Sequence, residues 1–181
     1  MSAQELNKEQ FHVLSVLVEN EAGVLARIAN LFAARAFNIE SLTVGPTHDE
    51  TMSRMTIVVK GSTNQLDQVK KQLQKLVEVV AVQDLAELGG FVARELMLIK
   101  VQTNEKTRLE ILNIGQLFNA KAIDYTPSAF TFELTGAPEK LDNFITFLQP
   151  FGISEIARSG VVAINRGEGG LQTQFQQKMA G

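Results

Sequence analysis

The chain has 181 residues, of which 45% are hydrophobic and 20% are charged, and its formal net charge is -3 at pH 7. This composition is typical of a globular protein with one domain or two small ones, and it does not suit a nucleic-acid binder with a clustered basic face. No apolar run approaches the ~20 residues of a membrane span, and the polar N-terminus lacks the apolar segment of a signal peptide. We therefore expect a cytoplasmic protein without nucleic-acid or membrane partners.

Apolar periodicity and turn residues divide the chain into two similar series of strands and helices. The first series has a strand at 11–18, a helix from 24 to about 36, strands at 38–44 and 55–59, a helix at about 64–76 and a strand at 77–85. The second has a strand at 95–101, a helix at 106–118, strands at 122–125 and 130–134, a helix that opens near Pro138, and strands around 153–157 and 161–164.

Each series follows the order βαββαβ, which predicts an α+β protein with two ferredoxin-like units. Each unit is expected to be a four-stranded antiparallel sheet with two helices on one face, so an oligomer is expected to cover the remaining face or edges. The predicted domains are 10–87 and 91–166, with a boundary at Gly89-Gly90. The Gly- and Gln-rich residues 167–181 predict a flexible tail, with a short partner-binding helix at 171–179 as the alternative.

The sequence lacks the residue constellations of an enzyme. Because there is no cysteine, disulfides, zinc ribbons and thiol catalysis are excluded. The chain has no GxxxxGK[ST] phosphate loop and no GxSxG elbow. Its two histidines, His12 and His48, have no partner at a metal-ligand spacing. We therefore predict no catalytic residue and no metal site.

The turn from Asn20 to Leu25 is the strongest candidate for a binding site. It joins a buried strand to the start of a helix, where free N–H groups and the helix dipole favour an anion. Gly23 lets a ligand approach the backbone closely, and the Asn20 amide can donate and accept hydrogen bonds. The turn could thus bind the carboxylate of a small molecule. The alternative is structural: Asn20 caps the helix and Gly23 permits a tight turn.

Asn38 raises the same choice at the other end of this helix. Asn tolerates the left-handed conformation common at helix ends, but its side chain could also bind an amino group. The residue pattern leaves both interpretations open.

Six segments of the sequence resemble one known family. The first unit contains 17–27 (LVENEAGVLAR), 37–42 (FNIESL) and 53–56 (SRMT), and the second contains 94–101 (RELMLIKV), 126–128 (TPS) and 157–162 (ARSGVV). The first of these is similar to the opening turn and helix of an ACT domain. Together, over about residues 11–167, they resemble the small regulatory subunit of acetolactate synthase, also called acetohydroxyacid synthase.

The resemblance implies a regulatory role without catalytic residues. The family's catalytic subunit uses thiamine diphosphate, FAD and magnesium in the first committed step towards the branched-chain amino acids. None of these cofactors is expected in this chain. The small subunit stimulates that enzyme and makes it sensitive to feedback inhibition by a branched-chain amino acid, usually valine.

The resemblance also implies where the effector binds. The N-terminal unit is then an ACT domain that forms a homodimer side by side with a second copy, and the C-terminal unit is an ACT-like domain. The effector sits at the dimer interface. Carried over by motif, one side of the site consists of Asn20, Gly23, Val24 and Leu25, and the other side, from the second protomer, consists of Asn38 and Ile39.

One residue departs from the family pattern. Ala36 stands where the family commonly has Gly, which bears on the affinity for the effector.

Two other functions compete with this interpretation. An RNA-binding module shares the βαββαβ order, but the chain lacks the aromatic RNA-binding motif of that fold. An ACT-domain amino-acid sensor that regulates a different partner or transcription is the closer alternative, although no helix-turn-helix accompanies the two units.

Overall fold

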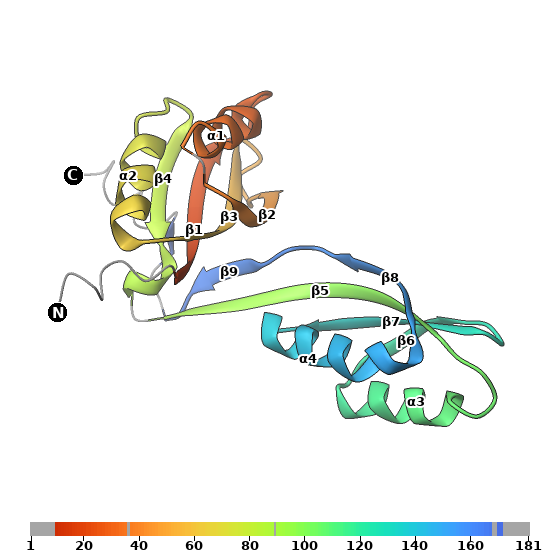
Figure 1. Ribbon diagram of the computed structural model, residues 1–181. Coiled ribbons are helices and arrows are strands. Elements are labelled where there is room, and N and C mark those ends of the chain that lie inside the picture. Colours follow the sequence, from red (N-terminus) through yellow and green to blue (C-terminus); the bar gives the residue numbers. More distant parts are fainter. Residues whose placement is uncertain (1–9, 36, 89, 168–169, 172–181) are drawn as a thin grey trace. The chain divides into compact units, whose positions relative to one another are not determined.

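The computed structural model describes residues 10–35, 37–88, 90–167 and 170–171. It contains two antiparallel sheets with helices packed against them (Figure 1). The chain divides into two compact units, which are described separately: one extends to Val92 and resumes at Val161, and the other is Ala93–Gly160. The predicted α+β class with two ferredoxin-like units is confirmed.

The first unit contains the first βαββαβ series. Its elements are β1 (Gln10–Glu19), α1 (Val24–Ala33), β2 (Ile39–Pro46), β3 (Met52–Gly61), α2 (Thr63–Leu73) and β4 (Val79–Asp84), followed by the short 3-10 helix η2 (Leu85–Leu88). The strand order in the sheet is β2-β3-β1-β4, so β2 and β4 are the edge strands.

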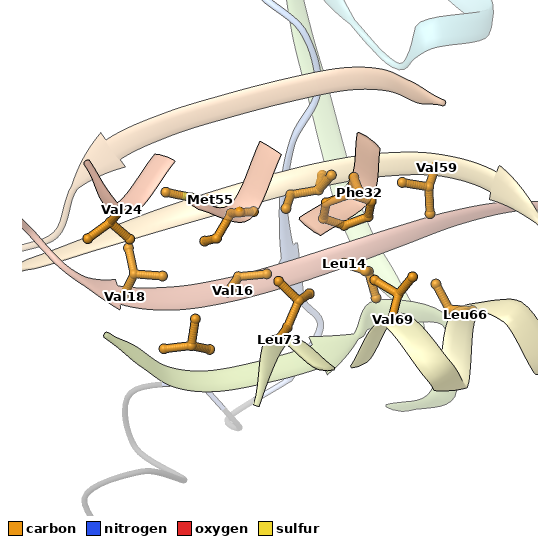
Figure 2. Packing of buried hydrophobic residues seen from close by; sticks show 13 residues of the cluster. Leu14, Val16, Val18, Val24, Phe32, Met55, Val59, Leu66, Val69 and Leu73 are labelled. Atoms are coloured by element: carbon orange, nitrogen blue, oxygen red, sulfur yellow. The ribbon is translucent and has the colours of Figure 1, made fainter. Parts of the chain in front are cut away.

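Alternation along the strands assigns one face of this sheet to the core. Leu14, Val16 and Val18 of β1 are almost fully buried, and the two helices pack over them. Figure 2 shows these side chains facing the buried side chains of α1 and α2. The buried residues of each helix recur at helical spacing. Burying each such aliphatic side chain contributes about 1.5–3 kcal/mol. The buried helix residues are Val24, Ile28 and Phe32 in α1 and Leu66, Val69 and Leu73 in α2.

The second unit repeats this arrangement around a core rich in phenylalanine. Its elements are β5 (Phe91–Gln102), α3 (Arg108–Leu117), β6 (Lys121–Tyr125), β7 (Ala129–Gly136), α4 (Pro138–Leu148), the 3-10 helix η3 (Gln149–Phe151) and β8 (Ile153–Arg158). The strand order is β6-β7-β5-β8. The ring of Phe132 packs edge-on to Phe144 of α4 at a centroid distance of 5.8 Å. Gly115 of α3 leaves room for the same ring, because a Cβ there would lie 2.7 Å from it.

The last strand, β9 (Val162–Asn165), belongs with the first unit, together with the preceding Val161. It pairs with β5. Val161 and Ala163 are 8% and 1% exposed, whereas Val162 and Ile164 are more than half exposed, so one side of the segment is buried. This division differs from the predicted domain bounds, which assigned residues 91–166 to the second unit.

Two expectations concern residues that the structure describes only in part. Of the predicted tail, Gly167, Gly170 and Leu171 are described, and Leu171 is buried. Residues 168–169 and 172–181, as well as Ala36, lie outside the described residues, so the flexible tail stays a prediction. Among the described residues, no helix is long and apolar enough to cross a membrane.

The burial of β9 predicts a sharp difference between two neighbouring positions. Ala163→Glu would place an unpaired charge at a buried site, which should lower the free energy of unfolding by about 3 kcal/mol or more. Val162→Glu makes the same chemical change at an exposed site and should alter stability by less than about 0.5 kcal/mol. Thermal and urea denaturation of both variants would test this. Equal stability of the two variants would contradict the placement of β9.

Candidate functional site

Asn20 ties the turn after β1 to the hairpin between β2 and β3. Its backbone N–H donates to the Thr51 carbonyl at 2.7 Å, and its side-chain Nδ2 donates to the Glu50 carbonyl at 3.0 Å. Its Oδ1 accepts a hydrogen bond from the Ser53 hydroxyl at 2.9 Å. The interpretation of Asn20 as a helix cap is therefore wrong, because its side chain bonds the hairpin and α1 has no side-chain cap.

Gly23 is the residue that opens α1. Its φ of 89° lies in the left-handed region, which a side chain makes costly, and its carbonyl accepts the first helical hydrogen bond, from the N–H of Arg27 at 3.0 Å. Because no side chain caps this end of the helix, its first N–H groups are free to bind an anion together with the positive end of the helix dipole. The geometry thus has the donors that a carboxylate needs.

The two apolar residues after Gly23 have different surroundings. Val24 is 3% exposed and belongs to the core, so only its backbone N–H can serve a ligand. Leu25 is 44% exposed and is the apolar side chain that a ligand could contact. Of the predicted apolar lining at this end, the structure therefore exposes the side chain of Leu25.

A cation stands beside the turn but is already neutralised. The Arg27 guanidinium lies 2.6 Å from the carboxylate of Glu78, and a Cβ at Gly23 would lie 3.8 Å from Arg27. Since the Arg27 side chain is 54% exposed, this pair adds little stability. The turn therefore presents backbone N–H groups more than a free positive side chain.

Asn38 and Ile39 stand just before and at the start of β2. The Asn38 amide is exposed and donates to the Glu40 carboxylate at 2.8 Å. Ile39 is half-buried, pairs with Val59 of β3 and packs against the first core. No described hydrogen bond joins either residue to the turn at Asn20.

Within one chain, these two groups of residues lie at opposite ends of the sheet. Asn20 bonds Ser53 at the start of β3, whereas Ile39 pairs with Val59 near the end of the same strand. At roughly 3.3 Å per residue, Ser53 and Val59 are about 20 Å apart. A single small molecule cannot contact both groups in one copy.

Three polar residues outside the predicted set lie in or beside the hairpin that holds Asn20. Ser53 is 5% exposed and donates to the Asn20 amide oxygen, and nothing in the local sequence distinguishes it from the other polar residues of β3. Arg54 follows it, and burial of its guanidinium lowers its pKa. The acidic loop residue Asp49 accepts two hydrogen bonds from Thr51, which lower the pKa of its carboxyl and stabilise the hairpin turn.

The described residues contain no group of three or more His, Asp or Glu side chains that could hold a metal ion.

Family models match both units. Residues 14–81 match the model described as the AHAS small subunit-like ACT domain, and residues 94–167 match the model described as the small subunit of acetolactate synthase. The matches together cover most of the chain.

Individual relatives agree with the family models. The chain is 49% identical over 160 residues to the acetolactate synthase small subunit of Mycolicibacterium smegmatis, covering 88% of this chain and 94% of that protein. It is 47% identical over 157 residues to the acetolactate synthase isozyme 3 small subunit of Salmonella typhimurium, covering 86% and 96%. The crystal structure of the acetolactate synthase small subunit from Thermotoga maritima has a TM-score of 0.79 and 42% identity, covering 88% and 99%.

The left-handed backbone of Gly23 predicts a conformational cost for any side chain. In Gly23→Ala the new Cβ would meet no atom closer than 3.8 Å, so the loss of stability, about 1–2 kcal/mol, comes from φ alone. Gly45→Ala is the control, because a Cβ there meets nothing within 4 Å and no left-handed φ is present. Thermal denaturation should show a lower Tm for Gly23→Ala only. A Gly23→Ala variant as stable as Gly45→Ala would contradict the described helix start.

Proposed function

The chain belongs to the acetolactate synthase small-subunit family, and we propose that it is the regulatory subunit that stimulates the catalytic subunit and confers feedback inhibition by a branched-chain amino acid. Valine is the proposed main effector. Thiamine diphosphate, FAD and magnesium are proposed to belong to the catalytic subunit, in the cytoplasm. This chain would contribute no catalytic residue.

The observation that carries the effector site is the uncapped start of α1 beside Asn20. An amino acid presents a carboxylate, which needs donors, and an ammonium group, which needs acceptors. The first N–H groups of α1 are the donors. Asn20 Oδ1 accepts one hydrogen bond, from Ser53, and a carbonyl oxygen can accept a second. The exposed side chain of Leu25 is available to an isopropyl group.

The register of the sheet supports a site shared between two copies. β2 is an edge strand, and an edge strand can pair with the same strand of a second copy. In a two-fold antiparallel pairing, the Ile39 end of one β2 lies beside the Pro46 end of the other. Pro46 pairs with Ser53, which bonds Asn20. Such a homodimer would bring Asn38 and Ile39 of one copy to the Asn20 turn of the other.

The site is expected to prefer valine only modestly. One additional methylene in an apolar pocket changes binding by about 1–3 kcal/mol. Leucine and isoleucine should therefore compete with valine at higher concentration.

The effector site predicts how substitutions change inhibition of the reconstituted enzyme. Asn20→Ala and Asn38→Ala should each raise the L-valine concentration for half-maximal inhibition about tenfold, which corresponds to ~1.4 kcal/mol of lost hydrogen bonding. The rate of acetolactate formation would be measured at increasing L-valine concentrations and expressed relative to the rate of the same variant without L-valine. Asn64→Ala, at an exposed position in α2, is the matched control, and D-valine is the control ligand. Wild-type sensitivity in Asn20→Ala would contradict the assignment.

The shared site also predicts complementation between the two variants. In a mixed dimer of Asn20→Ala and Asn38→Ala, one site carries both substitutions and the other carries neither. Mixing the two proteins under conditions that exchange subunits should therefore restore wild-type affinity for L-valine at one of the two sites of each mixed dimer, an affinity that neither variant shows alone, as measured by calorimetry. No restoration after confirmed exchange would indicate that each site lies within one copy.

A further inference from the structure

The helix-free face of the first sheet carries a polar row that crosses all four strands. The pairing register places Thr43 of β2 opposite Thr56 of β3, Thr56 opposite Ser15 of β1, and Ser15 opposite Gln83 of β4. Ser15 and Thr56 are 0% and 2% exposed although α1 and α2 cover the other face. Something other than the helices therefore buries this row.

The segment from Val161 to Asn165 covers the row and bonds its members in order. The Thr43 hydroxyl donates to the Val161 carbonyl at 2.8 Å, and the Ala163 N–H makes a long hydrogen bond of 3.5 Å to the Thr56 hydroxyl. The Asn165 amide donates to Gln83 at 2.7 Å. The C-terminal strand thus runs across the strands of the first sheet instead of extending it at an edge.

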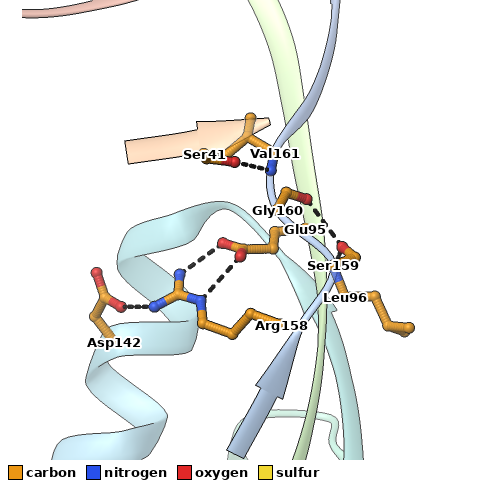
Figure 3. Close-up of polar contacts among 8 residues, drawn as sticks. All are labelled: Ser41, Glu95, Leu96, Asp142, Arg158, Ser159, Gly160 and Val161. Carbon is orange, nitrogen blue, oxygen red and sulfur yellow. Dashed lines mark hydrogen bonds and ion pairs between the residues drawn. The ribbon is translucent and has the colours of Figure 1, made fainter. Parts of the chain in front are cut away.

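The first of these contacts holds the backbone of Val161 on both sides of its Cα, through its N–H and its carbonyl. The Val161 N–H donates to the Ser41 hydroxyl at 2.9 Å (Figure 3), and the Val161 carbonyl accepts from the Thr43 hydroxyl. Ser41 and Thr43 belong to β2, the strand that begins with Ile39 of the proposed effector site. A register irregularity in the pairing of β2 with β3 lies between Ile39 and Ser41, where a bulge re-aims side chains. A shift of the Ile39 end would therefore reach Ser41 first.

The residues just before Val161 are anchored within the second unit. The Arg158 guanidinium donates to both carboxylate oxygens of Glu95, at 2.6 and 2.9 Å, and to Asp142 at 2.7 Å. The hydrogen bonds from Arg158 to Glu95 raise the pKa of Arg158. Ser159 exchanges hydrogen bonds with the backbone of Leu96, with its N–H donating at 2.9 Å and its hydroxyl accepting at 3.1 Å. Figure 3 shows these contacts on the chain that leads to Val161.

A single residue separates the two anchored points. Gly160, with φ of 81°, lies between Ser159, held in the second unit, and Val161, held by β2. Because Val161 is held through two hydroxyl groups, its peptide can change position without breaking the ladder of the sheet. A coupling element requires two such arrangements.

We propose that the Val161 peptide is the element through which β2 reports the bound effector to the second unit, so that Ser41 and Thr43 couple effector binding to the activity of the catalytic subunit. This inference rests on the proposed function. The effector must stabilise one arrangement of β2 over another, and the Ser41–Val161–Thr43 contact transmits that difference. By linkage, the catalytic subunit must then change the affinity for the effector by the same factor.

The test removes the two hydroxyl groups while keeping the volume and strand propensity of β2. Ser41→Ala/Thr43→Val is the test variant, Thr43→Val is a milder one, and Ser41→Thr/Thr43→Ser retains both hydroxyls. Ser15→Ala is the matched control, because the buried Ser15 hydroxyl lies on the same face and has no hydrogen-bond partner within the described part of the chain. Affinity for L-valine is measured for the chain alone and for the reconstituted holoenzyme, together with inhibition.

In the wild type the two affinities should differ by about 5- to 150-fold, the usual range of coupling. In the absence of the catalytic subunit, Ser41→Ala/Thr43→Val should bind L-valine as the wild type does. The ratio of its affinity in the holoenzyme to its affinity as the chain alone should fall towards one, and inhibition should be lost. Thr43→Val should show the same change to a smaller degree, and the hydroxyl-retaining and Ser15→Ala variants should behave as the wild type.

Three outcomes would overturn the proposal. A double variant inhibited like the wild type would exclude coupling through this contact. A second contrary outcome is that Ser41→Ala/Thr43→Val and Thr43→Val fold, as confirmed by thermal denaturation, but do not bind L-valine in the absence of the catalytic subunit. Ser41 and Thr43 would then support the binding site and would not be coupling residues. A wild-type holoenzyme that does not respond to any branched-chain amino acid would instead refute the proposed function, and this inference with it.

Discussion

The burial of a polar row by the C-terminal strand is the constraint on which the first unit depends. A ferredoxin-like sheet has helices on one face only, and here the other face carries Thr43, Thr56, Ser15 and Gln83. Buried hydroxyl and amide groups are costly unless they are hydrogen-bonded. The peptide groups of Val161 and Ala163 and the side chain of Asn165 are the partners of three of these four residues. The first unit therefore depends on residues that follow the second unit in the sequence.

The proposed effector site is divided between two ends of the sheet in the same unit. Asn20 is committed to the hairpin through Glu50 and Ser53, which leaves the start of α1 uncapped. Asn38 and Ile39 lie about 20 Å away along the sheet, at roughly 3.3 Å per residue. The proposed homodimer through β2 would bring the two halves together, and it would do so at the strand that the Val161 peptide holds. The proposed effector site and the proposed dimer interface thus share β2 with the contact to Val161.

Much of the fold follows from local patterns in the sequence, whereas the contacts with the proposed regulatory role do not. Alternation in β1 and helical spacing from Val24 to Phe32 predict their elements, because each buries one apolar side. The pattern of Val161 to Ile164 predicts a strand but does not indicate which sheet the strand packs against. Its position depends on hydroxyl groups that are far away in the sequence. Likewise, an Asn before a helix is ambiguous between a cap and a ligand contact, and only the positions of Glu50 and Ser53 show that Asn20 is not a cap.

The most direct measurement is hydrogen exchange of the reconstituted holoenzyme with and without L-valine, resolved to peptides that cover β2 and residues 161–165. If β2 carries the effector and the Val161 peptide reports it, L-valine will slow exchange in both segments by a similar factor and over the same range of concentrations. Protection confined to the turn at residues 20–25 and to the start of β2, with unchanged exchange at Val161 and Ala163, would contradict the account.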